Sequence, residues 1–388
     1  MAEQIRRRAI FFVGGYDPKT PQAFFGRMDK EIARFEKLWG AATSRSAVEG
    51  GEGIGRIGIR TRIEGRDIET EFNFFVLDSL VLSDFARPLP VRLGKYLVAF
   101  CDFVLTGTAF RIFARAWRFG LYFLFPFLMI AGFAALGWIA ARLSEPWLGR
   151  AAILSGIAVF AAAQWKLGER WPVNHLMDLW SFSRNFIRGR RPDADALMER
   201  FAECAVARAK AGNFDEIILV GHSTGGLLIL DIAGRCLEHD PAFGTRAAQV
   251  SLLTIGSTAL KGGLHPAGTR LRAQVRSLAE TGTIHWVEVQ CLTDVINFYK
   301  TDPVSEMGVQ AREDFPLVRR IRIKDMLEPD TYKRIRKSFF RVHYQYIFGN
   351  TKPYWYDFFQ ICCGPLPLLE RAQKMIVGAG AASEGGQA

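Results

Sequence analysis

The chain of 388 residues carries a formal net charge of +11 and is 49% hydrophobic, with a mean hydropathy of +0.07. This hydropathy is high for a chain in which 23% of the residues are charged, so the apolar residues must be concentrated in particular segments. A positive charge is also typical of nucleic-acid-binding proteins, but the sequence has neither zinc-finger spacing nor an RNA-recognition signature. The basic residues instead gather beside apolar segments, so we expect a membrane bilayer and no nucleic acid as a partner.

The six cysteines form no CxxC pair and show no metal-ligand spacing. This pattern predicts reduced thiols in a cytoplasmic compartment. The first residues, MAEQIRRRAIFFVGG, are basic and then apolar, but their apolar core is too short for a signal peptide. Export is therefore not expected.

The first part of the chain has the pattern of an α/β domain. A buried strand is predicted at Ala9–Val13 and a helix at Gln22–Trp39, and isoleucines alternate with charged residues over Ile57–Glu64, as in a strand. Phe72–Leu77 is predicted as a further strand. Gly53–Gly58 satisfies GxGxxG but precedes a strand instead of following one, so we interpret it as a turn and not as a dinucleotide site.

The central part of the chain holds the apolar residues. From Phe119 to Ala141 no charged side chain occurs, and a run of this length suffices to cross a bilayer. A short turn, Arg142–Arg150, follows. The next apolar run, Ala151–Trp165, spans a bilayer only if it begins near Pro146. We therefore predict transmembrane helices at about 119–141 and 147–165, with a buried helical hairpin in a soluble core as the alternative.

Basic residues flank this predicted hairpin on both sides. They are Arg111, Arg115, Arg118, Lys166 and Arg170. The positive-inside bias predicts a protein of the cell (inner) membrane, with the flanks and the rest of the chain in the cytoplasm. Only the turn is expected on the opposite side of the membrane. The apolar segment Tyr96–Phe110 is expected along the membrane surface.

After the hairpin the α/β pattern resumes. The predicted helices are Ala194–Ala211 and Gly225–Leu237, and the predicted strands are Glu216–Val220, Val250–Ile255, Trp286–Gln290 and Leu317–Ile323. Alternation of strands and helices predicts a mostly parallel sheet flanked by helices. The domain prediction is therefore an α/β domain in two parts, residues 1–90 and 191–376, interrupted by a membrane-associated insertion, 91–190, and followed by a disordered tail, 377–388.

The predicted strand Glu216–Val220 ends in GHSTG, and a helical pattern starts directly after it. This stretch fits GxSxG, in which a strained strand-to-helix turn exposes a serine and small neighbours allow close backbone approach. Ser223 is therefore the candidate nucleophile, at the carboxyl edge of the sheet and beside a helix N-terminus that stabilises developing negative charge. The alternative is a glycine-rich turn with an incidental serine.

In this strand–turn–helix context the chain resembles the α/β-hydrolase superfamily, over about Ala9–Leu77 and Asp193–Asn350. The resemblance implies an α/β-hydrolase fold and a catalytic triad in the chain order serine, acid, histidine. Among the histidines after Ser223, only His343 follows the last predicted strand, so it is the candidate base. The alternative is a surface histidine in an aromatic-rich segment.

The acid is expected after the preceding strand, where Asp294 follows Gln290. This stretch is similar to DDHD-type phospholipases, in which an aspartate precedes an apolar-aromatic run that ends in an acid–proline pair. Asp294 and Asp302-Pro303 match these positions. Asp302 is the alternative acid if Val295–Tyr299 is the strand instead, and we prefer Asp294.

Two backbone donors of an oxyanion hole are implied. We assign them to the N–H groups of Thr224 and of Tyr16 (or Gly15), because the loop FFVGGYDP lacks HGGG but has glycines that allow its amides to face the elbow. The chain departs from the family in two ways: the leading antiparallel strands are missing or replaced by the pair within Ile57–Leu77, and no lid insertion separates the Val250 and Trp286 strands.

These features predict a membrane-anchored serine hydrolase that cleaves lipid or other acyl esters through Ser223, His343 and Asp294 and an acyl-enzyme. No cofactor and no metal are implied. A thioesterase, an acyltransferase or a peptidase would use the same triad, and neither the substrate nor the oligomeric state follows from the sequence. The competing hypothesis is a non-catalytic membrane scaffold or partner-binding protein that retains the fold.

Overall fold

The computed structural model describes residues 5–51 and 53–378, so nearly all of the expected disordered tail, 377–388, lies outside the described residues. The chain divides into two compact units. Unit 1 consists of Met1–Val81 and Pro192–Ala388, and unit 2 consists of Leu82–Arg191. Helix α2 (Asp78–Phe85) contains the first boundary between them.

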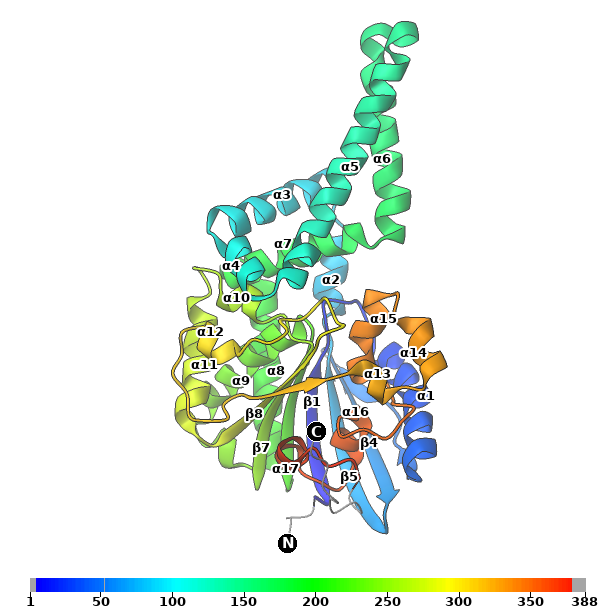
Figure 1. The fold of residues 1–388 in the computed structure, drawn as a ribbon. Helices are drawn as coiled ribbons and strands as arrows, with labels where there is room; N and C mark the ends of the chain where they lie inside the picture. The colour runs from blue at the N-terminus through cyan, green and yellow to red at the C-terminus, as the bar shows by residue number, and fades with distance from the viewer. Residues whose placement is uncertain (1–4, 52, 379–388) are drawn as a thin grey trace. The chain divides into compact units, whose positions relative to one another are not determined.

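The described residues of unit 1 form a nine-stranded sheet in the order β2-β4-β5-β1-β6-β7-β8-β9, with β3 paired to β4 (Figure 1). The strands are β1 Arg7–Val13, β2 Ala42–Arg45, β3 Glu49–Gly51, β4 Ile54–Ile63, β5 Arg66–Phe75, β6 Glu216–His222, β7 Gln249–Ile255, β8 Ile284–Cys291 and β9 Leu317–Ile321. All neighbours from β5 to β9 pair in parallel, whereas β4 is antiparallel to β5, and β2 and β3 are antiparallel to β4. The prediction of a mostly parallel sheet flanked by helices is confirmed.

The burial of each strand explains how clearly its hydrophobic pattern appears in the sequence. Every residue of β6 is buried, as expected for a parallel strand covered on both faces. In β4 buried and more exposed residues alternate, because only one of its faces packs against helices. β5 begins at Arg66, earlier than the predicted start at Phe72, because the same alternation, with Ile68 and Thr70 buried, extends through its polar first half.

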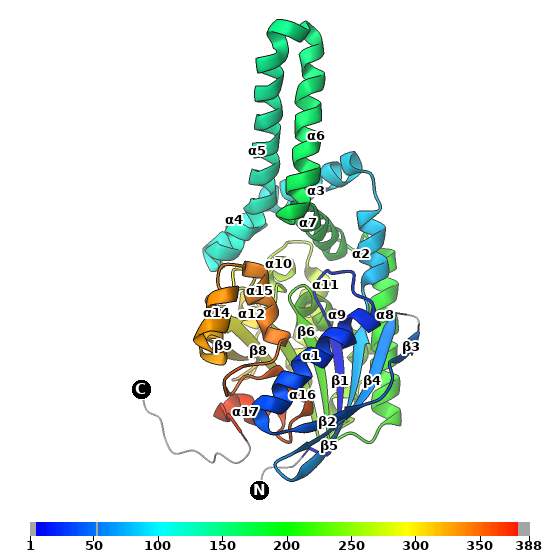
Figure 2. The same ribbon diagram turned by 90° about the vertical axis from the view of Figure 1, so that its right-hand side faces the viewer.

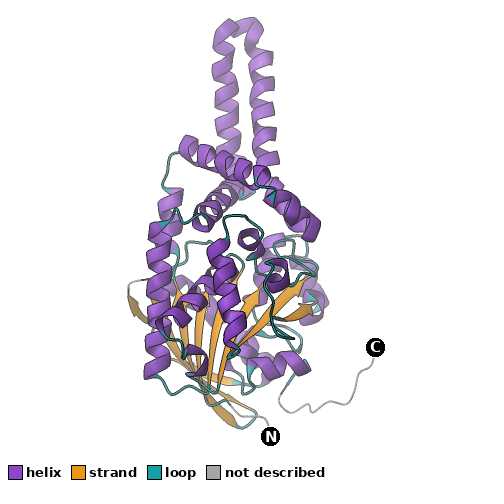
Figure 3. Cartoon of the chain, turned by 90° about the vertical axis from the view of Figure 1, so that its left-hand side faces the viewer, coloured by secondary structure: helices purple, strands orange, loops and turns teal. Residues whose placement is uncertain are grey.

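Helices cover both faces of the sheet (Figure 3). The helices of unit 1 are α1 Pro21–Trp39, α8 Pro192–Ala211, α9 Gly225–His239, α10 Leu260–Gly263, α11 Thr269–Thr281, α12 Pro303–Glu306, α13 Ile323–Met326, α14 Pro329–Ile335, α15 Phe339–Tyr344, α16 Phe358–Cys363 and α17 Leu368–Lys374. Helices α8, α9 and α11 pack together on one face, and α1 and α16 lie on the other (Figure 1).

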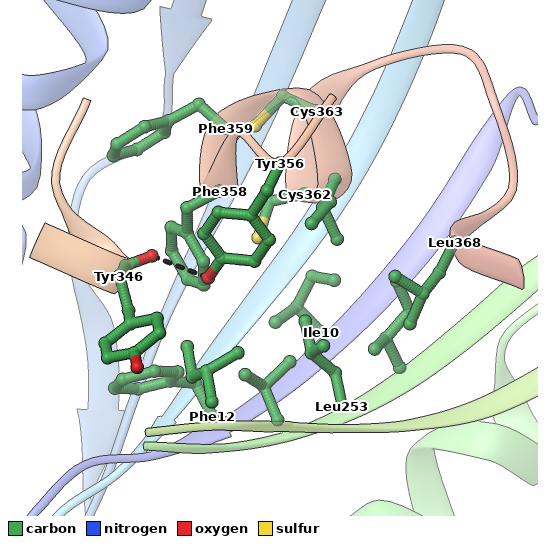
Figure 4. Packing of buried hydrophobic residues seen from close by; sticks show 14 of the residues in the cluster. Ile10, Phe12, Leu253, Tyr346, Tyr356, Phe358, Phe359, Cys362, Cys363 and Leu368 are labelled. Atoms are coloured by element: carbon green, nitrogen blue, oxygen red, sulfur yellow. Dashed lines mark hydrogen bonds between the residues drawn. The ribbon is translucent and has the colours of Figure 1, made fainter. Parts of the chain in front are cut away.

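The segment after β9 closes the core over β1. Figure 4 shows Phe12 of β1 beside Tyr346 and Phe358, and the Tyr356 hydroxyl donates to the Tyr346 carbonyl at 2.7 Å. Arg8, also on β1, is fully buried and donates to the carbonyls of Cys362, Gly364 and Leu366. Its ion pair with Glu216, at 2.6 Å, offsets part of the cost of burying the two charges. The C-terminal segment is thereby fixed to the two central strands.

Unit 2 is helical in its described residues. Besides the end of α2, its helices are α3 Leu89–Leu105, α4 Thr108–Arg115, α5 Trp117–Leu148, α6 Ala152–Arg170 and α7 Val173–Ile187. One helical stretch, Trp117–Arg170, is long and apolar enough to cross a membrane, and only 22% of its most apolar window is buried. Helices α3 and α4 pass the same test only together, and they are bent by 70°. The apolar segment Tyr96–Phe110 lies within this bent pair.

Helices α5 and α6 run side by side (Figure 2). Their backbones touch at two glycines: a Cβ on Gly137 would lie 2.6 Å from the Gly156 carbonyl oxygen, and a Cβ on Gly156 would lie 2.7 Å from that of Gly137. Nearer the connection, the hydroxyls of Ser144 and Ser155 are 2.6 Å apart. Small residues at both positions therefore allow the close approach.

The predicted turn Arg142–Arg150 is wrong for most of its length. Helix α5 continues to Leu148, and the reversal is confined to a 3₁₀ turn, Gly149–Ala151, which Gly149 enters with φ 51°. The charged residues that indicated a turn are compatible with a helix, because Arg142 and Glu145 are three residues apart and form an exposed ion pair at 2.7 Å.

The contact at the two glycines leads to a prediction about the helix pair. In a variant with Ser144→Cys and Ser155→Cys, mild oxidation should form a disulfide that links α5 to α6. With a protease site inserted at Gly149, the cleaved chain should then stay in one piece until the disulfide is reduced. Adding Gly137→Leu should strongly reduce the link, because the side chain would displace the Gly156 backbone. Gly132→Leu is the matched control, because a Cβ there has no atom within 4 Å. Equal linking in both variants would contradict the close crossing of the two helices at Gly137 and Gly156.

Candidate active site

Ser223 occupies the turn between β6 and α9 with a backbone φ of 60°. This left-handed conformation costs on the order of 1–3 kcal/mol for a residue other than glycine and persists only where the surroundings enforce it. Here the Ser223 N–H donates to the Ile255 carbonyl and its own carbonyl accepts from the Thr258 N–H, both at 3.1 Å. The strained turn is thus held on both sides of its Cα by the end of β7 and the loop after it.

The glycines of the motif permit close backbone approach. A Cβ on Gly225 would overlap the carbonyl oxygens of Val13 and Gly14, and a Cβ on Gly221 would lie 2.5 Å from the Gly225 carbonyl oxygen. The loop after β1 is therefore packed directly against the turn. Gly15 of that loop lies beside the serine: an ideal Cβ on Gly15 would be 3.3 Å from Ser223 Cβ and 3.5 Å from Ser223 Oγ.

Asp294 and His343 lie together although 49 residues separate them. Asp294 follows β8, His343 is in α15, and the His343 Nδ1–Asp294 Oδ2 distance is 2.8 Å. The other carboxylate oxygen accepts from the Ile296 N–H at 2.8 Å, which fixes the orientation of the acid. The two side chains are 4% and 0% exposed, so the pair is shielded from water. With its Nδ1 proton donated to Asp294, the ring presents Nε2 as an acceptor.

The loop after β7 also places His343 near the serine. Ile255 accepts the Ser223 N–H, and a Cβ on the next residue, Gly256, would lie 3.1 Å from His343 Cε1. Across the described residues His343 Nε2 is buried and makes no hydrogen bond, so no direct bond joins it to Ser223. Catalytic hydrogen bonds are often long in enzymes without substrate and shorten only in the complex.

Asp302 has a different environment. Its carboxylate caps α12 by accepting from the Val304 and Ser305 N–H groups at 2.9 and 3.1 Å. The alternative strand Val295–Tyr299 is not a strand in the structure. Of the two candidate acids, the structure therefore brings Asp294 to His343.

The two expected oxyanion donors flank the serine. Thr224 is the N-cap of α9, where backbone N–H groups have no partner within the helix. Tyr16 is buried and follows Gly15, the residue packed against Ser223. The two segments that carry these candidates therefore meet at the Ser223 turn.

His222 is a site residue that sequence reasoning missed. It is buried, its Nε2 lies 3.1 Å from the His343 carbonyl oxygen, and the two imidazole centroids are 4.6 Å apart. Burial holds the pKa of His222 well below its usual 6.5, and the neighbouring His343 acts in the same direction. A neutral ring that donates Nε2–H fixes the backbone of the helix that carries His343. The position of His222 inside GHSTG was the only sequence signal for this role. No spacing rule predicts a contact with His343, which is 121 residues later in the chain.

A second missed group connects the loop after β1 to α15. The Tyr344 hydroxyl donates to Asp17 at 2.7 Å, Lys19 donates to the same hydroxyl at 3.2 Å, and Lys19 and Asp17 form an ion pair at 2.5 Å. Burial lowers the pKa of Lys19, and Asp17 opposes that shift. These three residues line a small pocket together with Gly14, Gly15, His222 and the apolar side chains of Phe12, Phe24, Phe74, Phe75, Leu77 and Ile347.

A possible metal-ligand cluster lies elsewhere in unit 1. Glu199, Glu203 and His239 have ligand atoms within 4.8 Å of one another, the only such group of three among the described residues. Glu199, however, already forms an ion pair with Arg235, and its other carboxylate oxygen lies 2.7 Å from His239 Nε2. We assign no metal to this exposed cluster.

Comparisons with protein-family models, with curated proteins and with solved structures find no match for this chain. The functional assignment therefore rests on the geometry of the site.

The burial of His222 leads to a pH prediction. The unfolded chain binds a proton at this imidazole below about pH 6.5, whereas the folded protein keeps it neutral, so acid must lower the free energy of unfolding. His222→Gln retains a donor for the His343 carbonyl but does not titrate. Between pH 7 and pH 5 the wild type should lose about 1–2 kcal/mol more than this variant. Denaturant titrations at the two pH values measure the difference, and parallel losses would show that His222 is charged in the folded protein.

Proposed function

We propose that this chain is a membrane-anchored serine hydrolase that cleaves carboxylic esters of lipids or other acyl compounds. The observation that carries the proposal is the left-handed Ser223 at the end of β6, combined with a buried Asp294–His343 pair whose Nε2 has no partner among the described residues. A strained serine, a base and an orienting acid are the parts of an acyl-transfer site.

The topology supports an α/β-hydrolase fold. The nucleophile follows β6, the acid follows β8 and the base follows β9, the last strand, which is the chain order expected for that superfamily. On the other side of β6 lies β1, whose carboxyl end supplies the loop of the second oxyanion donor. The antiparallel β4 takes the place of the usual leading strands.

The proposed reaction has two halves. His343 Nε2 takes the proton of the Ser223 hydroxyl as Oγ attacks the ester carbonyl, and Asp294 holds the Nδ1–H tautomer and stabilises the imidazolium. The N–H groups of Thr224 and of Tyr16 (or Gly15) stabilise the oxyanion, with the N-terminal end of α9 adding its dipole. The protonated histidine gives its proton to the leaving alkoxide. It then takes a proton from the water that attacks the acyl-serine carbonyl, and returns that proton to Ser223 Oγ as the C–Oγ bond breaks and the carboxylic acid leaves.

The surface of α5 and α6 supports membrane anchoring. Large apolar side chains are exposed along both helices: Leu121, Leu128, Leu136, Trp138, Ile139, Leu143, Trp147, Leu148, Ile153, Leu154, Ile157, Val159 and Trp165. Exposed apolar surface of this extent is unfavourable in water and favourable in lipid. We propose that the two helices insert as a hairpin into the cell membrane, with the basic flanks and unit 1 in the cytoplasm. Anchoring favours long-chain substrates, because an acyl chain that stays in lipid avoids about 0.8 kcal/mol per exposed CH₂.

The catalytic proposal predicts the behaviour of four variants in detergent. Ser223→Ala should abolish labelling by a fluorophosphonate and, like His343→Ala, should lower ester turnover by about 10⁴-fold or more. Asp294→Asn should lower turnover by about 10³–10⁴-fold through loss of the correct tautomer. Asp302→Asn is the matched control in the same segment and should keep turnover within a few-fold of wild type. A folded wild-type protein that takes up no label would favour the non-catalytic scaffold instead.

The membrane proposal predicts opposite locations for two reporters. A reporter inserted near Glu145, beside the connection between α5 and α6, should lie outside the cytoplasm. A second one fused after Ala388 should lie inside it. Alkaline phosphatase and green fluorescent protein activities distinguish the two compartments, and two cytoplasmic reporters would refute insertion of the hairpin.

A further inference from the structure

Lys261 is a buried lysine at the candidate active site. It lies in α10, shortly after β7, is 1% exposed, and its Nζ donates to Thr224 Oγ1 at 3.1 Å. Burial lowers its pKa to about 7, so the amine is fully charged only below neutral pH. Placing an ammonium group inside a protein opposes folding, so a lysine here calls for a role other than stability.

The segment that carries Lys261 encloses the nucleophile turn. The Thr258 N–H donates to the Ser223 carbonyl, and the Lys261 N–H donates to the Thr258 carbonyl, each at 3.1 Å. A Cβ on Gly226 would lie 2.7 Å from the Cβ of Ser257. One short stretch therefore contacts Ser223 through its backbone, Thr224 through the lysine and Gly226 through a serine.

We propose that Lys261 is a positioning residue for the oxyanion site: its ammonium group holds the Thr224 side chain, orients the adjacent N–H and adds positive potential where the negative charge forms. A charge-assisted hydrogen bond is stronger than a neutral one, so it restricts the rotation of Thr224. The charge lies in a water-excluded region at the N-terminus of α9, where it acts in the same direction as the helix dipole. The inference rests on the proposed hydrolase function and assigns Lys261 an effect specific to the transition state.

A structural role and a catalytic positioning role of Lys261 predict opposite outcomes for Lys261→Met. This variant keeps the volume of the side chain and removes the buried charge, so it should fold with an unfolding temperature equal to or above that of the wild type. Below pH 7, where the wild-type amine is protonated, its kcat for a soluble ester should fall by about 10- to 100-fold with little change in KM, because the lost interaction acts on the oxyanion. Its affinity for a trifluoromethyl ketone, which forms an anionic hemiketal with the serine, should fall by the same factor. The matched control is Lys210→Met, a half-exposed lysine on α8, which should change neither quantity.

Thr224→Val tests the same hydrogen bond from the other side and serves if Lys261→Met does not fold. It keeps the backbone N–H and removes the acceptor, so it should reproduce most of the loss in kcat. Thr224→Ser should restore most of that loss. The double variant should be no slower than the worse single variant, because both changes remove one interaction.

Three results would overturn the inference. Unchanged kcat and unchanged ketone affinity in Lys261→Met would show that the lysine only fills space. Additive losses in the double variant, together with a lower unfolding temperature and a higher KM, would assign it a structural role. Full activity of Ser223→Ala would refute the proposed function itself, and that variant is measured first, so the two failures are distinguishable.

Discussion

The candidate site depends on one strained residue and on what holds it. Ser223 has a left-handed backbone, and both of its peptide groups bond to the end of β7 and the loop that follows it. The parallel pairing of β6 with β7 supplies those partners in register, with His222 opposite Ile255. Formation of the sheet therefore provides the energy that keeps the serine in this conformation, and a loss of pairing at the end of β7 would release it.

The remaining site groups are brought to this turn by contacts between distant segments. Asp294 binds His343, His222 binds the His343 backbone, and Tyr344 binds Asp17 in the loop after β1. Three strand ends thus hold the short helix α15. Its position is further fixed by the C-terminal segment, where Tyr356 bonds to the Tyr346 carbonyl. Such a helix of six residues has little stability of its own, so its placement depends on these tertiary contacts.

Local patterns were sufficient for much of the fold and for part of the site. The helix α1, the strand β6 and the turn at Ser223 follow from periodicity and from GxSxG, because each depends on neighbours in the chain. The contacts of Arg8 with the C-terminal segment and of Tyr344 with Asp17 were not predictable, since more than 300 residues separate the partners. The extension of α5 through Arg142–Leu148 was missed for another reason: exposed charges mark a turn and a solvated helix end equally well.

The position of unit 2 in the chain explains why a large insertion leaves the sheet intact. It lies between β5 and β6, the two strands that flank β1. A parallel connection between such strands needs a long crossover in any case, and α8, which follows the insertion, supplies the helix of that crossover. The insertion therefore extends an existing connection and interrupts no pair of neighbouring strands. Since loop-closure entropy grows only with the logarithm of loop length, the added residues cost the sheet little stability. A long apolar helix pair can thus be added to an α/β domain at this point while the elements that hold Ser223 remain unchanged.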